Sequence, residues 1–428
     1  MSQGAPHSAA AGNQTHLRGL VVERLITCDE ARSTKDNPLG ALTDVAIVWD
    51  DTQIVFIGPK DEAPSGAALE SHPGCVVTPG LVDAHTHAAW AGSRHHEYAL
   101  RMAGADYRAI AAAGGGILST QRAVAASTHD ELAQMLEARL RRMASLGVTS
   151  VEVKSGYGLE AEHEIKQLEV IRTLGAKSDL PHLVPTFLAL HAIPESAKAT
   201  RDLYILKIAT QFVRQIAAAD LAVFVDAYVD QNAFSVEEAR LVCESARSAG
   251  LGLRLHVGQF HDVGGAALAA QLGARTVDHL ENVSDAAIAA LAKANVAAVL
   301  LPLASFTLGQ APPPVARLRA AGIKLIVASD ANPGTAPTES LPLAMAMAVR
   351  MYGLHPDEAI LGATRHAGAS LSVPRNGPKP RGQLMVGGHA DLVLWNLPHE
   401  HAIVQPWGVS MTRKVWRDGV CIANAQPS

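Results

Sequence analysis

Hydrophobic residues gather along this chain in short, nearly continuous runs that alternate with amphipathic segments. The runs lie at residues 80–87, 148–154, 182–190, 222–229, 251–257, 274–279, 296–304 and 322–329. Strands that are buried on both faces of a parallel sheet need this uninterrupted apolar character. The pattern therefore predicts eight buried, parallel strands.

The amphipathic segments between the runs carry helix start signals. Ser235 is followed by Glu238, and Thr128 by Glu131, which is the spacing of a capping box. The second of these segments continues to Gly147, a residue type that often ends helices. Strands that alternate with helices predict an α/β protein, here a (β/α)8 TIM barrel. A doubly wound open sheet is the alternative, and the number of strands favours the barrel.

Both ends of the chain differ from the central part. Residues 17–78 and 382–428 contain short β-type runs that are separated by turn residues. We expect them to form one small β-sandwich domain beside a metal-dependent hydrolase barrel at 79–381. Residues 1–16 lack the charged and apolar regions of a secretory signal, so we expect a disordered N-terminal tail.

Composition narrows the class of protein. Of 428 residues, 48% are hydrophobic and 18% charged, with a formal net charge of −5, which does not suit a nucleic-acid binder. No run approaches the ~20 apolar residues of a membrane span. The four scattered cysteines have no C-x-x-C spacing and suit a reducing cytoplasm. We expect a cytoplasmic protein with a small-molecule substrate and a homodimeric assembly.

The first run ends with two histidines, His85 and His87. Side chains alternate across a strand, so these two imidazoles should project from the same face. Neutral imidazoles side by side suit a divalent metal such as zinc. A pair of ordinary polar residues at a strand end is the alternative interpretation.

Other runs end in the same way. In a TIM barrel the carboxyl ends of the strands meet at one opening, where catalytic groups gather. The third, fifth, sixth and eighth runs are followed or ended by His191, His256, His279 and Asp330. So many candidate donors at one opening point to a metal centre.

We expect a single metal ion per chain. Catalytic zinc takes about three protein ligands and leaves a position for water. The predicted ligands are His85, His87, His256 and Asp330. Zn²⁺ is the favoured ion and Fe³⁺ the alternative. A second ion would need a bridging group, whereas the fourth strand carries Asp226 and no lysine.

The remaining polar groups would perform the chemistry. A metal lowers the pKa of its water and makes hydroxide available as a nucleophile. His191 and His279 are then free to polarise a carbonyl or to move protons, and Asp330 can hold the water. These three are the predicted catalytic residues.

Longer stretches make the pattern more specific. The chain resembles the amidohydrolase superfamily and, within it, the imidazolonepropionase family from about residue 17 to the C-terminus. The matching stretches are HTHAAWAGSRHHEYALRMAGADYRAI and GGGILST within 85–120, EVKSGYGLE (152–160), TFLALHAIP (186–194), VDHLEN (277–282) and SDANPGTAP (329–337). The resemblance implies metal-dependent hydrolysis of the cyclic amide 4-imidazolone-5-propanoate to N-formimidoyl-L-glutamate, the third step of L-histidine degradation.

The resemblance also implies a set of substrate contacts. A propionate tail needs a cation, and Arg94 offers a fork that suits a carboxylate; by residue type alone it would be a surface arginine. The further residues that match the family pattern are Tyr107, Tyr157, His191, Gln259, Asn332, Gly334 and Thr335. Family members carry Glu or Gln at the position of Gln259. An amide does not titrate, so proton transfer falls to Asp330 and His279.

The chain departs from the family pattern at 226–235 and 301–308, which affects the expected substrate more than the reaction type. One rival hypothesis is another mononuclear-metal cyclic amidase or deaminase. A different class of rival is a catalytically inactive binding or scaffold protein. Such a protein would show a missing ligand or a missing strand-eight acid, and all of them are present.

Overall fold

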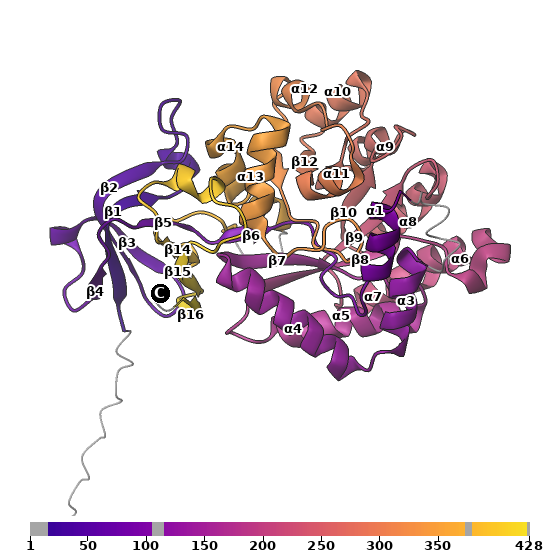
Figure 1. The fold of residues 1–428 in the computed structure, drawn as a ribbon, viewed down its shortest axis with the longest axis horizontal. Helices are drawn as coiled ribbons and strands as arrows, with labels where there is room; N and C mark the ends of the chain where they lie inside the picture. The colour runs from indigo at the N-terminus through magenta and orange to yellow at the C-terminus, as the bar shows by residue number, and fades with distance from the viewer. Residues whose placement is uncertain (1–15, 105–114, 373–378, 426–428) are drawn as a thin grey trace, which may run out of the picture.

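An eight-stranded parallel barrel forms the larger part of the molecule. The computed structural model describes residues 16–104, 115–372 and 379–425 of the chain. The barrel strands neighbour one another in chain order, and each pair is parallel. They are β6 (Leu81–Asp83), β7 (Val148–Lys154), β8 (His182–Leu190), β9 (Phe224–Val229), β10 (Gly252–Val257), β11 (Thr276–His279), β12 (Ala297–Leu300) and β13 (Leu325–Val327). The predicted TIM barrel is confirmed (Figure 1).

The barrel closes between its first and last strands through backbone that follows each strand. Thr86 forms an isolated parallel bridge with Ala331. The Asp330 N–H donates to the His85 carbonyl oxygen over 3.1 Å, and the His87 N–H donates to that of Ala331 over 3.0 Å. These bonds fix the two histidines relative to the aspartate.

Several strands are shorter than predicted, and the first, the seventh and the last differ most; the last, β13, covers only 325–327 of the predicted 322–329. β6 ends at Asp83, so His85 and His87 lie in the segment after it. The seventh strand ends at Leu300 and does not continue to residue 304, because Pro302 begins helix α11 (Pro302–Leu308). Proline fits the first turn of a helix, where its missing N–H costs nothing. A short apolar run does not distinguish a buried strand from a buried helix.

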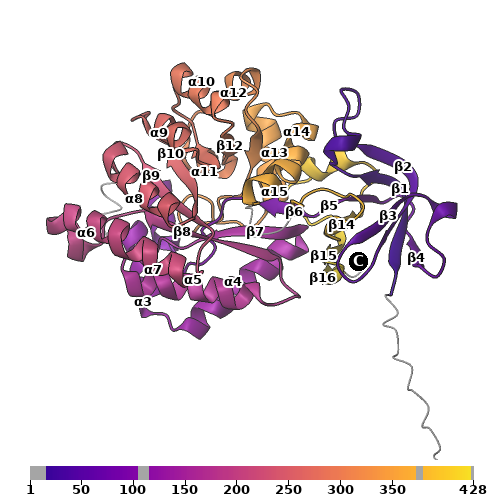
Figure 2. The same ribbon diagram turned by 180° about the vertical axis from the view of Figure 1, so that it is seen from behind.

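Helices surround the barrel on its outside (Figures 1 and 2). In chain order they are α1 (His95–Met102), α3 (Ile117–Ala126), α4 (His129–Ser145), α5 (Ala161–Gly175), α6 (Arg201–Lys207), α7 (Val213–Ala218), α8 (Val236–Ser248), α9 (Gly265–Leu272), α10 (Asp285–Lys293), α11, α12 (Val315–Ala320), α13 (Leu341–Tyr352), α14 (Pro356–Gly362) and α15 (Arg365–Leu371). Short turns are η1 (Glu30–Arg32), η2 (Lys60–Glu62), η3 (Glu195–Thr200), the π-helical η4 (Ile208–Phe212) and η6 (Glu400–Val404). No helix in the described ranges has the length and apolar character to cross a bilayer.

Both predicted capping boxes are confirmed. Thr128 accepts a hydrogen bond from the backbone of Glu131 at the start of α4, and Ser235 accepts one from Glu238 at the start of α8. In each case the glutamate side chain bonds back to the cap residue. α4 is followed by Gly147, whose φ of 94° needs a residue without Cβ strain.

Strands from both chain ends form a second, mixed sheet. Its order is β16-β15-β14-β5-β1-β2-β3, and β4 pairs with β1. The strands are β1 (Arg18–Ile26), β2 (Ala41–Trp49), β3 (Ile54–Pro59), β4 (Ala68–Ser71), β5 (Val76–Pro79), β14 (Leu392–Trp395), β15 (Thr412–Arg417) and β16 (Val420–Asn424). The antiparallel β5–β14 pair joins the two ends of the chain, as the small domain predicted from both ends requires.

This terminal sheet curls around a core of its own. The rings of Trp49 on β2 and Trp416 on β15 lie 5.6 Å apart in an edge-to-face arrangement. These strands are not neighbours in the sheet, so the sheet must bend to bring the rings together. Both tryptophans are buried with residues such as Leu25 and Leu392 from the two chain ends. One continuous sheet therefore provides the two facing layers expected of a sandwich.

Candidate active site

Four predicted metal ligands meet where the barrel strands end. One ligand atom from each of His85, His87 and His256 lies within 4.8 Å of the others. Oδ1 of Asp330 is 3.4 Å from Nε2 of His85 and 3.5 Å from Nε2 of His87. The His87 and His256 Nε2 atoms are 3.4 Å apart. The barrel thus brings together residues from its first, fifth and eighth strands, all of them buried.

The chemical state of these residues fits a metal ion. Burial, together with nearby positive groups, holds the pKa of His85 and of His87 well below the ordinary value. Both imidazoles are therefore neutral, which is the form that ligates metals. Nε2 of His85 is buried and has no hydrogen-bond partner among the described residues. An unpaired buried nitrogen is costly, and a cation would satisfy it.

Buried carboxylates orient two of the rings. Asp278 Oδ2 lies 2.7 Å from Nδ1 of His85, and Asp226 Oδ1 lies 3.0 Å from Nδ1 of His256. A metal-binding histidine is commonly held in this way, because an acceptor on one nitrogen fixes the other nitrogen as the ligand. In both rings this leaves Nε2 for the shared centre.

The backbone is strained at two of the site residues. Asp330 has a φ of 54°, His279 one of 81°, and Leu280 one of 72°. Residues with a Cβ rarely adopt these values, and such strain gathers at functional sites. At these residues the backbone changes direction where β11 ends and shortly after β13 ends, at the barrel opening.

A buried charge network lies beneath the cluster, and sequence reasoning did not find it. Lys154 Nζ is 2.8 Å from Glu152 Oε1 and 2.8 Å from Asp226 Oδ2. Burial alone would lower the pKa of Lys154, but these two carboxylates raise it. Burial alone would raise the pKa of Asp226, but His256 and Lys154 hold it well below its ordinary value. The lysine therefore stays charged and supports the carboxylate that orients a ligand.

A signal for this network was present in the sequence. Glu152 and Lys154 lie two positions apart on β7, as do Arg254 and His256 on β10, so each pair shares one face. Arg254 is fully buried and donates to the Ala84 carbonyl oxygen over 2.7 Å. Alternating charges in an otherwise apolar strand therefore indicated the barrel interior.

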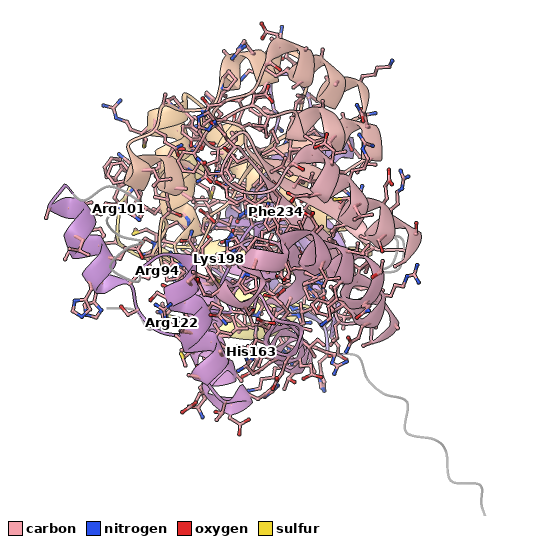
Figure 3. The ribbon with its side chains drawn as sticks, turned by 90° about the vertical axis from the view of Figure 1, so that its right-hand side faces the viewer. Arg94, Arg101, Arg122, His163, Lys198 and Phe234 are labelled. Carbon is pink, nitrogen blue, oxygen red and sulfur yellow. The ribbon has the colours of Figure 1, made fainter. Side chains whose placement is uncertain are left out.

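Arg94 lies beside the histidine cluster with part of its guanidinium unused. Its Nε donates to Thr120 Oγ1 over 2.8 Å, and its Cζ lies 5.8 Å from the ring centre of Tyr157. Nη2 is buried and without a hydrogen-bond partner in the described part of the chain. The Tyr157 ring in turn lies 5.9 Å from that of His87. Figure 3 labels Arg94 and Arg101 on the same side of the molecule.

The loop after β13 packs against this arginine. Asn332 Oδ1 accepts hydrogen bonds from the backbone of Gly334 and Thr335, so its side chain holds the loop in shape. The Gly334 carbonyl accepts from Arg101 over 3.1 Å. A Cβ at Gly334 would overlap with Nη1 of Arg94. Glycine is therefore the residue that lets this loop approach the guanidinium.

His191 and Tyr157 line the opening together. The His191 ring stacks on that of His87 at 5.4 Å and lies 5.2 Å from that of Tyr157. Nδ1 of His191 lies 2.6 Å from the Gly156 carbonyl oxygen. Burial lowers the pKa of His191 to about 3, so its ring is neutral. Tyr107, also predicted to contact the substrate, lies outside the described residues.

The segments that depart from the family pattern reach Gln259 directly and His279 through Glu281. Glu281 Oε2 lies 3.6 Å from Nδ1 of His279; burial lowers the pKa of His279, but Glu281 and nearby acids raise it overall. The Ser305 hydroxyl donates to Glu281 over 2.6 Å. Gln259 Oε1 accepts from the Tyr228 hydroxyl over 2.9 Å. Both departures, at 226–235 and 301–308, therefore reach the site.

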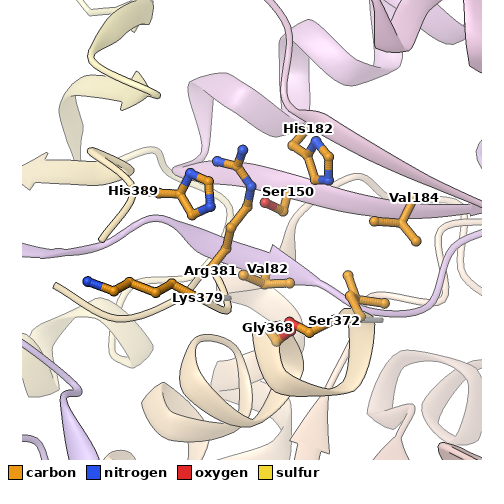
Figure 4. Close-up of a pocket in the computed structure, with 10 residues that line it drawn as sticks. Val82, Ser150, His182, Val184, Gly368, Ser372, Lys379, Arg381 and His389 are labelled. Carbon is orange, nitrogen blue, oxygen red and sulfur yellow. Dashed lines mark hydrogen bonds between the residues drawn. The ribbon is translucent and has the colours of Figure 1, made fainter. Parts of the chain in front are cut away.

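A separate cavity of about 70 Å³ lies at the other end of the strands (Figure 4). Its lining includes Ser150 and His182 from the first halves of β7 and β8, and Arg381 and His389 from the segment that enters the terminal sheet. None of the predicted site residues lines it. The histidine cluster, and not this cavity, is therefore the candidate centre of chemistry.

Comparisons with known proteins agree with this arrangement. A model of the amidohydrolase family matches residues 108–423. Imidazolonepropionase from Shewanella baltica is 40% identical over 387 residues, which are 89% of this chain and 94% of that protein. Imidazolonepropionase from a Polaromonas species is 40% identical over 419 residues, which are 97% of this chain and 95% of that protein.

Solved structures share the fold at low sequence identity. A triazine hydrolase variant has a TM-score of 0.72 at 15% identity and covers 96% of this chain and 95% of its own. An adenosine deaminase from Xanthomonas campestris, solved with bound zinc, has a TM-score of 0.70 at 18% identity and covers 94% and 92%. These likenesses show the architecture of barrel and terminal sheet.

Proposed function

This chain belongs to the imidazolonepropionase family of amidohydrolases, a premise from which we propose that it hydrolyses the ring of 4-imidazolone-5-propanoate to N-formimidoyl-L-glutamate. The reaction breaks a carbon–nitrogen bond in a cyclic amide and belongs to L-histidine degradation. The observation that carries the proposal is the burial of a four-residue donor cluster next to a guanidinium with an unpaired nitrogen. The cluster suits amide hydrolysis, and the guanidinium suits the propionate tail.

His85, His87, His256 and Asp330 would hold the metal ion, with Asp278 and Asp226 orienting two of the rings. Once bound, the ion supplies Lewis-acid chemistry, since it polarises an amide carbonyl and lowers the pKa of water. We propose Zn²⁺ over Fe³⁺, because imidazole and carboxylate donors suit zinc.

The chain's own residues then move the protons. The attacking water loses a proton to the Asp330 carboxylate, and the ring nitrogen that leaves must gain one. His279, whose pKa is raised beside Glu281, can supply that proton through its imidazole. Gln259 cannot titrate and holds substrate or water by hydrogen bonds. His191 and Tyr157 contact the carbonyl side of the ring.

Arg94 binds the substrate carboxylate with its free Nη2. Asn332, Gly334 and Thr335 form the wall against which the guanidinium rests. Tyr107 completes the predicted set of contacts. A charge-assisted pair of this kind contributes roughly 1.5–3 kcal/mol, which is about 10–150-fold in affinity.

One experiment tests the function and the role of Arg94 together. The purified protein should consume imidazolonepropionate, followed by the loss of imidazolone absorbance. By elemental analysis it should contain one metal ion per chain that His85→Ala lacks. Arg94→Met should raise KM by about 10–150-fold while the metal stays bound. Arg94→Lys should recover only part of this loss, because lysine lacks the fork. Turnover of other cyclic amides or amines, but not of this substrate, would instead favour a related amidase or deaminase.

We also propose a homodimer and a cytoplasmic location. The location is supported by four free cysteines, three of them buried, which suit a reducing compartment. Sedimentation analysis of the purified protein measures the assembly, and a monomer would contradict the dimer.

A further inference from the structure

A second group of metal-ligating side chains lies outside the candidate active site. We call it the outer histidine cluster; it consists of His355, Asp357, His399 and His401. His355 is the cap residue of α14, and Asp357 lies in the first turn of that helix. His399 caps η6, the turn between β14 and β15, and His401 lies within it.

The rings and the carboxylate of this cluster are in contact, and one ligand atom each of His399, Glu400 and His401 lies within 4.8 Å of the others. The His399 and His401 rings are 4.7 Å apart, and the His355 and His401 rings 5.6 Å. Nε2 of His401 is 2.6 Å from Asp357 Oδ1, and Nδ1 of His355 is 3.2 Å from Asp357 Oδ2. The imidazoles of His355 and His401 thus flank one carboxylate, and the His399 ring lies against that of His401. All three histidine side chains are more than 40% exposed, which allows an ion to enter.

Neighbouring groups leave these donors available. Glu400 also lies within 4.8 Å of His399 and His401, but Arg24 binds its carboxylate through both Nε and Nη2. Nδ1 of His399 accepts only a long hydrogen bond, 3.2 Å, from the His401 backbone, and Nδ1 of His355 one of 3.3 Å from Asp357. A divalent cation can displace these backbone N–H groups from the imidazole nitrogens, because the cation carries full charge.

We propose that the outer histidine cluster binds one divalent transition-metal ion in addition to that of the active site. Imidazole nitrogens with a carboxylate oxygen are the donor set that zinc, nickel and copper prefer. The ion would join α14, a helix of the barrel, to the segment between two strands of the terminal sheet. It would therefore hold the two parts of the molecule together.

The test uses the full-length protein with its active site already loaded, and Zn²⁺ as the probe. Calorimetric titration should show a second equivalent of Zn²⁺, and this binding should raise the melting temperature. His399→Gln and His401→Gln should each weaken the second equivalent by at least about tenfold, without changing turnover. His129→Gln is the matched control, because His129 is a surface imidazole whose acidic neighbour is the adjacent Asp130.

The result does not depend on the proposed reaction, since the readout is binding. His85→Ala should lose the active-site ion and keep the outer one. Glutamine at 401 can still bond to Asp357, and glutamine at 399 can still accept from the His401 backbone N–H, so both variants should fold, and circular dichroism checks this. The proposal is overturned if the loaded wild type takes up no second equivalent, or if both glutamine variants bind like the wild type. Binding without a rise in melting temperature would overturn the joining role.

Discussion

At the scale of residues, one glycine bears on the proposed contact between Arg94 and the substrate. Gly334 lets its loop lie against Arg94, because a Cβ at this position would overlap with Nη1 unless the guanidinium shifted. We predict that Gly334→Ala displaces the guanidinium and raises KM by about tenfold, a loss of ~1.4 kcal/mol, while the metal content is unchanged. Steady-state kinetics with metal analysis measures both quantities. An unchanged KM would mean that the carboxylate binds elsewhere.

The division of proton transfer is also a matter of single residues. Gln259→Ala should lower kcat modestly, because the amide only positions groups through Tyr228 and the substrate. Asp330→Asn and His279→Ala should each lower kcat by about 10²–10⁴-fold, as expected for loss of a general acid or base. Asp330→Asn should also lose metal, since it removes a ligand. If Gln259→Ala were as inactive as Asp330→Asn with metal still bound, this division would be wrong.

Residue type and strand spacing were enough to predict the histidine cluster, since each member lies at or near the end of a predicted strand. Residue type alone did not predict Lys154 and Arg254, because lysine and arginine are mostly exposed residue types; only their alternation with another polar residue on an apolar strand indicated that they are buried. Only the closed barrel brings Lys154 within reach of Asp226 on another strand. The contacts that hold the metal ligands in place therefore depend on how the strands are arranged in the barrel, and the sequence of one strand does not show that arrangement.

At the scale of elements, local signals predicted helix starts better than strand ends. The capping boxes at Thr128 and Ser235 were correct because a cap is a contact between residues three apart. The end of the seventh strand was wrong because an apolar run such as 296–304 is compatible with a strand or a buried helix. In the structure a helix begins at Pro302, so the second half of this run is helical.

The caps lead to a prediction about stability. Thr128→Ala and Ser235→Ala should each lower the free energy of unfolding by about 1 kcal/mol, because each leaves a backbone N–H of the first turn unpaired. The effects should add, since the residues cap different helices. Denaturant unfolding measures this. Ser248→Ala is the control, because the Ser248 hydroxyl only bonds to the Glu244 carbonyl four residues earlier.

For the whole molecule, part of the terminal sheet packs into the hydrophobic core of the barrel, beside the sheet's own core. Val76, Val393 and Trp395 of the terminal sheet pack in the same cluster as the barrel residues. Nε1 of Trp395 donates to Thr78 over 2.8 Å, and its ring covers Gly147 just before β7. Two parts that are joined in this way should unfold together.

We predict that Trp395→Ala lowers the free energy of unfolding by about 3–5 kcal/mol in a single transition. Circular dichroism and intrinsic fluorescence should report the same midpoint. Trp407→Ala, at a site that is 56% exposed, is the matched control and should change little. Two separate transitions in the variant would show that barrel and sheet are independent units.

The pairing of β5 with β14 has a consequence for the order in which the chain is synthesised. β5 emerges from the ribosome with one edge bonded to β1, whereas the partner of its other edge is encoded near the end of the chain. At roughly 5–20 residues per second, the intervening ~300 residues take about 15–60 s to add. Throughout that interval a nascent chain carries an open strand edge, the kind of surface on which chains aggregate. The first domain to begin folding on the ribosome is thus the last to be completed.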